Sequence, residues 1–298
     1  MTWFYPSGQL KSGAWETVVQ RPGWEHTGLR VADIDSNAQL GLEPEEIERV
    51  LIPLHGSFNV EYKSPDVQSQ QFLNGRESVF SGPTDTLYLP VGFGASISGS
   101  GRIAVAEAKA TNLKPVRYKP AKEVEVEIRG TGASTRQVNN FGTPQTLDAD
   151  RIIVCEVITP AGNWSSYPPH KHDEYVPGQQ SNLEEIYYFE VAQAVTTVGP
   201  TPDSIAIDPI GYFRNYAQGP QSIDSLAEVR SGDVALVPFG WHGPAMAAPG
   251  YDLYYLNVMA GPDPDRSWNI VDDPNHSWQR AHWANQPADP RLPYQGKD

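Results

Sequence analysis

The chain has 298 residues, with 26 glycines, 27 prolines and a formal net charge of −14. The negative charge repels polyphosphates, which excludes nucleic acid as a partner, and no window approaches eighteen apolar residues, which excludes a membrane-spanning helix. The N-terminus lacks the basic start and long apolar stretch of a signal peptide, so we expect a cytoplasmic protein. Cys155 is the single cysteine, so no internal disulfide can form.

Short apolar segments separated by turn residues recur along the chain and predict β-strands rather than long helices. The alternation of EVEVEI, residues 123–128, is typical of a half-buried strand. We interpret LEPEEIERV, residues 42–50, as one short helix. The predicted strands span residues 48–61, 86–91, 102–107, 123–128, 151–158, 185–191, 234–238 and 252–259.

Two segments of the chain resemble each other: FSGPTDTLYLPVGFGA, residues 80–95, and RSGDVALVPFGWHGPA, residues 230–245. Each runs from Ser-Gly through an apolar strand to Pro, any residue, Gly and an aromatic residue. Such internal similarity indicates two copies of one β module. His242 of the second copy aligns with Gly94 of the first, so the copies differ at a chemically important position.

A polar stretch rich in Gly, Ser, Thr and Asn lies between the two copies, at residues 130–148, and is typical of a loop or linker. We therefore predict an N-terminal unit at residues 1–135 and a C-terminal unit at residues 136–298. The aromatic-rich tail that ends the chain is expected to pack against the C-terminal unit, because so many aromatic residues argue against disorder.

The stretch YPPHKHD, residues 167–173, places two histidines one residue apart. Alternate residues of a strand face the same side, so His170 and His172 point together. Glu185 opens the next apolar strand and His242 follows a later one, and neutral imidazole is the commonest metal ligand. Three histidines and a carboxylate would hold a divalent ion of the Zn, Mn or Fe class and leave room for water or a substrate oxygen.

This combination of motifs resembles the cupin superfamily, whose metal site takes two histidines and a glutamate from a first motif and one histidine from a second. The resemblance implies an all-β bicupin, with two tandem jelly-roll β-barrels and few short helices. It favours Glu185 over Glu184, because the ligand directly precedes the apolar strand. The gap between the histidines and the glutamate, filled by DEYVPGQQSNLE, is longer than in the cupin pattern.

Longer blocks give a closer resemblance, to the 5-deoxy-glucuronate isomerase family of inositol catabolism. It implies a metal-free N-terminal cupin, in agreement with Gly94, and one divalent ion per chain in the C-terminal cupin. It also implies conversion of 5-deoxy-D-glucuronate to 2-deoxy-5-keto-D-gluconate. The blocks are YPPHKHD, LEEIYYFE, VRSGDVALVPFGWHGPAMAAPGYDLYYLNVMAGP and RSWNIVDDPNHSW, with GPTDTLYLP and RIAVAEA in the N-terminal half, so the resemblance covers most of the chain.

The implied aldose–ketose isomerisation moves a proton between neighbouring carbons through an enediol. A metal bound to the carbonyl and hydroxyl oxygens would stabilise the negative charge that develops, and a positioned base would carry the proton. The candidates for this base are Asp173, Glu174, Glu190 and Tyr187. Tyr187 shares a strand face with Glu185 and should point into the barrel.

The implied substrate is a small anionic sugar acid, and a guanidinium group holds a carboxylate best, through paired hydrogen bonds. Arg266, just after the last strand, is the candidate for this contact, and Tyr255 and Lys171 are further substrate-binding candidates. Tyr255 and Asn257 share one face of the last strand and Tyr254 lies on the other, but the pattern leaves open which faces inward. A homo-oligomer that covers exposed sheet edges is compatible with this fold.

Three other functions stay open at this point. A cupin dioxygenase would use the same ligands to hold Fe(II). A 4-deoxy-5-threo-hexulose-uronate isomerase shares scaffold and chemistry but acts on a different uronate, although PPHKHD and LNVMAGP favour the inositol branch. A non-catalytic sugar-binding bicupin would need no metal, and the intact set of four ligands argues against it.

Overall fold

The computed structural model describes residues 2–194, 206–219 and 221–294 of the chain. These residues are almost entirely strands and turns, which confirms the all-β prediction. Their helical segments are short: η1 (Ala121–Glu123), η2 (Gly132–Ser134) and α1 (Gln279–Trp283). None of these helices has the length and apolar character needed to cross a bilayer.

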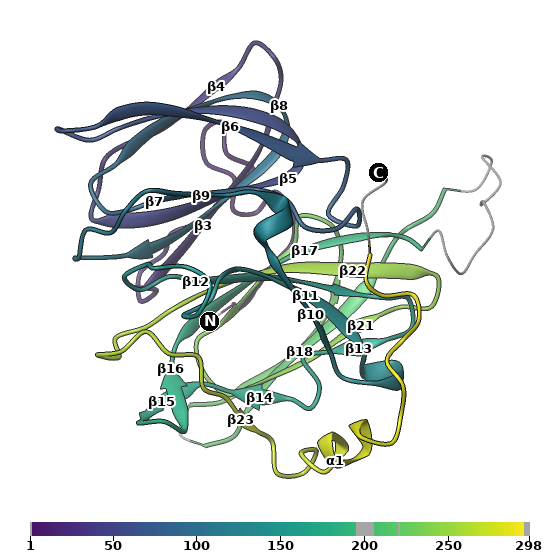
Figure 1. The fold of residues 1–298 in the computed structure, drawn as a ribbon. Helices are drawn as coiled ribbons and strands as arrows, with labels where there is room; N and C mark the ends of the chain where they lie inside the picture. Colours follow the sequence, from purple (N-terminus) through teal and green to yellow (C-terminus); the bar gives the residue numbers. More distant parts are fainter. Residues whose placement is uncertain (1, 195–205, 220, 295–298) are drawn as a thin grey trace.

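The N-terminal half forms one eight-stranded antiparallel sheet, drawn in purple and blue in Figure 1. Residues 42–50, predicted to be a helix, are the last residue of one strand, a loop and the start of the next strand, because the long pairing between residues 47–63 and 94–109 overrides local helix preference. The strand order is β2 (Thr17–Val19), β3 (Thr27–Ile34), β8 (Gly94–Lys109), β5 (Ile47–Lys63), β7 (Thr86–Leu89) and β9 (Arg117–Lys119), with β4 (Gln39–Leu42) paired to β8 and β6 (Gln68–Arg76) paired to β5.

The C-terminal half contributes two larger sheets and one hairpin. The first sheet has the order β1 (Phe4–Tyr5), β20 (Val234–Val237), β17 (Glu184–Gln193), β22 (Tyr251–Ala260), β12 (Ile153–Thr159), β11 (Arg136–Gly142) and β10 (Glu125–Arg129). The second has the order β19 (Ile223–Val229), β18 (Gly211–Ala217), β21 (Trp241–Ala247), β14 (His170–Lys171) and β23 (Val271–Asp272), with β13 (Trp164–Ser165) paired to β21. The hairpin joins β15 (Asp173–Val176) to β16 (Gln180–Asn182).

The large sheets of the two halves share one strand order. β2-β3-β8-β5-β7-β9 in the N-terminal half corresponds to β11-β12-β22-β17-β20-β1 in the C-terminal half. The strands of the predicted internal repeat, β7 and β20, therefore occupy matching places, each beside a long central strand. A short N-terminal strand, β1, completes the C-terminal sheet, so the two halves are interlocked through the chain itself.

The polar stretch at residues 130–148 is not a loop throughout, which corrects the prediction. It contains β11, all seven residues of which are buried. Polar side chains are tolerated there because they satisfy one another: Gln137 Nε2 donates to Asn139 Oδ1 at 2.9 Å, and Asn139 Nδ2 donates to Glu156 Oε1 at 2.6 Å. Strand pairing changes sheet between β9 and β10, and the division at residues 135 and 136 stays a prediction.

Three apolar clusters hold these layers together. One lies inside each half, and the third lies between the two large sheets, which are stacked in Figure 1. Strand β17 serves both sides: Ile186 and Tyr188 point into the cluster between the halves, whereas Tyr187 and Phe189 point into the C-terminal interior. Each fully buried side chain of this size contributes roughly 1.5–3 kcal/mol, so both faces of the strand are anchored.

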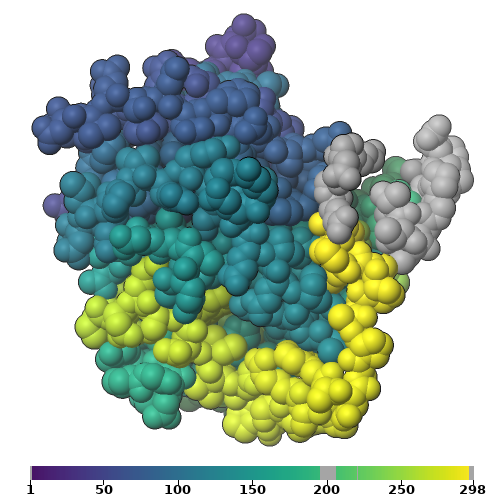
Figure 2. Space-filling view, in the orientation of Figure 1, coloured from purple at the N-terminus to yellow at the C-terminus, as the bar shows by residue number. Residues whose placement is uncertain are grey.

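Carboxylates also bind the two halves to each other. Glu48 of the N-terminal half accepts hydrogen bonds from the backbone N–H groups of Asp150, Arg151 and Ile152 at 2.9, 2.6 and 2.6 Å. In the opposite direction, Glu184 accepts hydrogen bonds from the backbone N–H groups of residues 25–27. The C-terminal tail, yellow in Figure 2, lies along the surface of the C-terminal half.

Candidate metal centre

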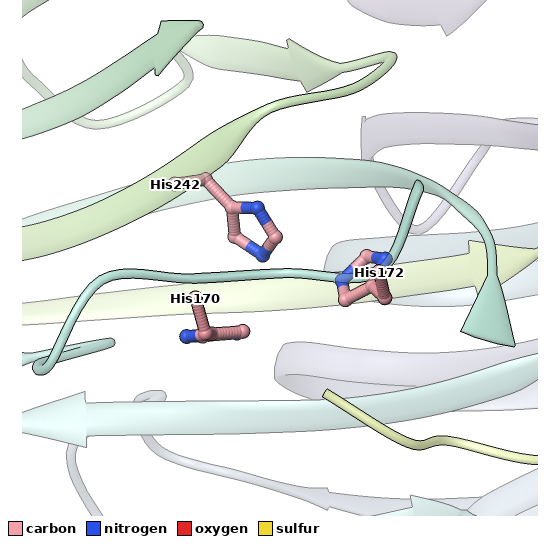
Figure 3. Close-up of side chains that lie close together, drawn as sticks. All are labelled: His170, His172 and His242. Atoms are coloured by element: carbon pink, nitrogen blue, oxygen red, sulfur yellow. The ribbon is translucent and has the colours of Figure 1, made fainter. Parts of the chain in front are cut away.

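The structure brings the three predicted histidines together (Figure 3). His170 in β14 lies directly opposite His242 in β21, in antiparallel register, and His172 follows β14. The ring centroids of His242 lie 4.4 Å from those of His170 and 4.7 Å from those of His172. One ring nitrogen from each histidine lies within 4.8 Å of the others, which is the spacing that a shared metal ion requires.

Glu185 approaches the same point from the neighbouring sheet. Its Oε2 atom lies 3.0 Å from Nε2 of His172 and 3.0 Å from Nε2 of His242. The long gap that precedes Glu185 in the sequence folds into the β15–β16 hairpin, and the backbone N–H of Leu183 then donates to the carbonyl of His172 at 2.9 Å. The hairpin therefore returns the chain to its starting point, and the extra residues do not displace the carboxylate.

Hydrogen bonds at the outer edges of two rings determine where their protons lie. Nδ1 of His172 is 3.3 Å from the Leu183 carbonyl, and Nδ1 of His242 is 3.3 Å from the Gly240 carbonyl. Because a carbonyl only accepts, each Nδ1 carries a proton, and the Nε2 atom of each neutral ring is then the one that can coordinate a metal ion. Nε2 of His242 is buried and, although Glu185 Oε2 lies 3.0 Å away, forms no well-aligned hydrogen bond with any described residue. Converging acceptors of this kind need a cation between them, so the residues fit a metal ion.

The ionisation of the cluster is consistent with this fit. Burial lowers the pKa of His170 well below its usual value, and the neighbouring His242 and His172 lower it further. Burial raises the pKa of Glu185, but the positive charge of the adjacent imidazoles outweighs burial and the net pKa is lowered. Burial lowers the pKa of His172, but its hydrogen bond to Glu185 and the charge of that carboxylate outweigh burial and raise the pKa above its usual value. The site thus presents a carboxylate and the neutral imidazole of His170, and a metal ion would displace a proton held between His172 and Glu185.

A cavity of about 130 Å³ adjoins the cluster. Its floor is formed where three strands lie side by side, with Cys155 of β12 opposite Asn257 of β22, and Asn257 opposite Tyr187 of β17. The side of β22 that carries Tyr255 and Asn257 therefore faces the site, and the side that carries Tyr254 faces away from it. The wall includes His170 and Glu185, and also Arg129, Arg136, Ser166, Trp268 and Arg280.

The tyrosines of this cavity form a hydrogen-bonded group with two serines. Tyr187 Oη lies 3.3 Å from Ser166 Oγ, and Tyr255 Oη lies 3.1 Å from the same oxygen and donates to Ser165 Oγ at 2.9 Å. Burial raises the pKa of Tyr187 well above its usual value and raises that of Tyr255 to about 12. Both phenols therefore hold their protons at neutral pH and act as hydrogen-bond donors.

Two residues predicted near the ligands are engaged in a separate polar contact outside the cavity. Asp173 accepts hydrogen bonds from Lys171 Nζ at 2.9 Å, from Gln180 Nε2 at 3.0 Å and from the Gly240 backbone N–H at 2.8 Å. Lys171 points away from the histidines, as strand alternation requires, and lies over the ring of Trp241. Neither side chain lines the cavity, and their predicted roles as base and substrate ligand stay predictions.

The structure does not bring Glu190 or Arg266 to the cluster either. Glu190 lies on the face of β17 that turns toward the N-terminal half, where it accepts a hydrogen bond from Tyr188 Oη at 2.6 Å and lies 3.4 Å from Arg102 Nε. The guanidinium of Arg266 donates to the backbone carbonyls of Ile152, Leu147 and Gly142 at 2.8, 2.6 and 2.6 Å. Both groups are engaged by protein partners away from the histidines, and their predicted roles stay predictions. The remaining base candidate, Glu174, is exposed in β15.

The sequence patterns did not identify the arginines of the cavity as site residues. Arg136 lies in the stretch that was read as a linker, and Arg129 and Arg280 lie on an edge strand and in helix α1. One general signal pointed to such residues, because an acidic chain that binds an anion must place positive charge at the site. That requirement does not say which arginines are meant.

The N-terminal half also has a cavity, of about 340 Å³, at the corresponding end of its sheet. Glu61, Lys63 and Gly94 are among the residues that line it. A Cβ atom at Gly94 would lie 3.0 Å from the backbone oxygen of Leu42, so the position has little room for a larger side chain. Within the described ranges, the three histidines of the C-terminal half form the one metal-binding group of three or more His, Cys, Asp or Glu side chains.

The strand order of the two halves defines the class of fold, which known structures share. Oxalate decarboxylases have the same fold: one such structure superimposes with a TM-score of 0.61 at 12% identity, covering 91% of this chain and 79% of that chain. At this identity the likeness concerns the fold alone, and it confirms the predicted bicupin architecture.

The chain belongs to the KduI/IolB family, whose pattern matches residues 4–279. It is 38% identical over 262 residues to the 5-deoxy-glucuronate isomerase of Geobacillus kaustophilus, covering 86% of each chain, and 37% identical over 261 residues to that of Geobacillus thermodenitrificans, covering 86% and 87%. An IolB-like protein from Salmonella typhimurium LT2 superimposes with a TM-score of 0.80 at 31% identity, over 94% of this chain and 100% of that chain. These comparisons confirm the predicted family.

Proposed function

We propose that this protein is a metal-dependent aldose–ketose isomerase that converts 5-deoxy-D-glucuronate to 2-deoxy-5-keto-D-gluconate in inositol catabolism. One observation carries the proposal: three imidazoles and a carboxylate converge beside an arginine-lined cavity in a chain of net charge −14. Such a site suits a substrate that is itself an anion and gains further negative charge during the reaction. The names of the relatives support the same substrate.

The proposed cofactor is one divalent ion per chain, of the Zn, Mn or Fe class. His170, His172, His242 and Glu185 would hold it, since their free lone pairs face one another. When bound, such an ion polarises a carbonyl and stabilises the negative charge of an enediolate. Three neutral imidazoles and one carboxylate leave the site with a formal charge near plus one, which complements that charge.

The protein groups around the cluster would orient the sugar and supply protons. We assign Tyr187 the role of a hydrogen-bond donor to an enediolate oxygen, because its phenol keeps its proton at neutral pH. The residue lies on the cavity floor, two positions after Glu185 and on the same face of β17. The hydroxyls of Ser166 and Tyr255 continue the hydrogen-bonded group and would hold the Tyr187 hydroxyl in place. The apolar side chains packed behind these residues exclude bulk water.

The direct test is incubation of the purified protein with 5-deoxy-D-glucuronate, followed by proton NMR of the product. We expect an aldehyde signal to disappear and a ketone product to form without oxygen uptake. Activity on 4-deoxy-5-threo-hexulose-uronate alone would favour that isomerase instead, and oxygen consumption would favour a dioxygenase. Chelator-treated protein should stop isomerising and recover with Mn, Fe or Zn, and undiminished turnover after chelation would remove the metal from the mechanism.

A further inference from the structure

Arg136 stands out among the arginines of the cavity because its charge has no carboxylate partner. It begins β11 and is 8% exposed. Within the described residues, both of its hydrogen bonds come from Nη1, to the carbonyls of Ser134 at 3.1 Å and Tyr167 at 3.4 Å, and no carboxylate oxygen lies within 4.0 Å of its guanidinium nitrogens. Burial lowers the pKa of Arg136 to about 10, so the group is still charged at neutral pH. A buried charge without a counter-ion is costly.

The other two arginines of the cavity are neutralised by the protein. Arg129 forms an ion pair with Glu127 at 2.8 Å. Arg280 makes a two-point contact with the carboxylate of Asp272, one bond of which measures 2.7 Å. Arg136 is therefore the cavity arginine that has no counter-ion among the described residues, and an anionic ligand would supply one.

The surroundings of Arg136 leave one edge of its guanidinium for such a ligand. The ring of Trp283, from helix α1, lies 5.4 Å from its central carbon and provides a flat support. Nη1 is held by the Tyr167 carbonyl, three residues before His170, so the guanidinium is tied to the segment that carries the histidines. Nε and Nη2, the edge that binds a carboxylate in a two-point geometry, make no hydrogen bond to the described residues.

Two further donors in the same cavity also have no partner. Nδ2 of Asn257 and Nε1 of Trp268 are buried and form no hydrogen bond with the part of the chain that the structure describes. An unpaired buried donor costs about 1–3 kcal/mol, so native proteins rarely leave several in one cavity without a ligand to bind them. Both residues line the same cavity as Arg136, so its lining offers polar groups beside the guanidinium.

We propose that Arg136 binds the substrate carboxylate, at the end of the sugar away from the histidine cluster, and so selects sugar acids over neutral sugars. The identity of the sugar rests on the proposed function. The selection itself rests on the unpaired guanidinium. This assignment takes the place of Arg266, whose guanidinium is occupied by backbone carbonyls.

Calorimetric binding tests the assignment independently of turnover. The first probe is borohydride-reduced 5-deoxy-D-glucuronate, which keeps its carboxylate but cannot isomerise, and the second is the matching neutral alditol. We expect Arg136→Gln to weaken binding of the acid about 10- to 100-fold and to change binding of the alditol less than about twofold. Arg136→Lys should fall between, because lysine keeps the charge but not the planar fork.

A matched control is Arg214→Gln, on β18, whose partner is Asp224 and which lies outside the cavity. It should bind both probes as the wild type does. Circular dichroism and metal content establish that the Arg136 variants are folded; if the glutamine variant does not fold, the lysine variant must still show the loss for the acid alone.

The outcomes separate this assignment from the reaction. If the wild type isomerises 5-deoxy-D-glucuronate but Arg136→Gln keeps its affinity for the acid, the assignment is wrong and the reaction stands. If the wild type isomerises no uronate but Arg136→Gln loses the acid selectively, the reaction is wrong and the carboxylate site stands. An equal loss of both probes, or no binding of the acid to the wild type, would also overturn the assignment.

Discussion

Replacing Glu156 by glutamine should destabilise the protein by about 3–5 kcal/mol. Glu156 of β12 is fully buried and faces the N-terminal half, where both of its oxygens accept hydrogen bonds from Arg76 at 2.7 Å. Asn139 donates a third bond at 2.6 Å. Glutamine keeps the shape but removes the charge, so the guanidinium of Arg76 is left buried with no counter-ion.

The magnitude follows from the burial of both partners. The Arg76 side chain is 3% exposed, and burial alone would lower its pKa, but the charge of Glu156 outweighs burial and raises the pKa above its usual value. Hydrogen bonds to charged groups contribute roughly 1.5–3 kcal/mol each, and the variant weakens two of them. A loss of this size is a large part of the 5–15 kcal/mol that typically stabilises a folded domain.

Urea denaturation followed by circular dichroism gives the free energy of unfolding. A double variant, Arg76→Met with Glu156→Leu, should recover most of the loss, because it leaves no unpaired charge. Glu123→Gln is the exposed control: its pair with Arg117 spans 3.3 Å between side chains that are 48% and 60% exposed, so we expect a change below about 0.5 kcal/mol. A loss below about 1 kcal/mol for Glu156→Gln, or a double variant as unstable as the single one, would refute the reasoning.

Three further variants address the metal centre, the backbone beside it and the C-terminal tail. His170→Ala combined with His172→Ala should reduce bound metal from about one ion per chain to near zero by elemental analysis, because half of the ligands are lost. Gly243→Ala should lower stability by about 1–3 kcal/mol, since Gly243 has φ +91° and a Cβ atom would lie 1.9 Å from a backbone oxygen. Asp289→Asn should cost about 2 kcal/mol at pH 7, because the hydrogen bond from Arg291 lowers the pKa of Asp289 from 3.8 to about 2. A lowered carboxyl pKa stabilises the folded state above pH 4, so this difference should disappear as the pH falls from 4 to 2.

For each of these three variants, a different outcome would contradict the prediction. Wild-type metal content in the double histidine variant would remove the site assignment. Gly162 has φ +79° but open space around it, so Gly162→Ala serves as the control and should cost less than Gly243→Ala; equal costs would show that the close contact does not matter. A stability difference for Asp289→Asn that persists at pH 2 would mean that the ion pair is not its cause.

Much of the fold and the histidine cluster could be predicted because their signals are local or nearly so. Alternation and turn residues identify strands such as β12 and β22 at close to their final bounds. The alternate spacing of His170 and His172 predicts that they lie together, and they do, although β14 itself ends at Lys171. Glu185 and His242 could be added because each stands at the end of a recognisable apolar strand.

The inward face of the central strands could not be predicted, because both faces are buried. On β22, Tyr254 packs between the two halves and Tyr255 packs inside the C-terminal half, so no polar alternation distinguishes them. For Glu190 the sequence does hold the signal, because strand alternation places it, five residues after Glu185, on the opposite face of β17. The sequence by itself determined which residue types form strands and which histidines pair. Only the tertiary structure decided which arginine reaches the cavity, because that depends on strands distant in the sequence packing against one another.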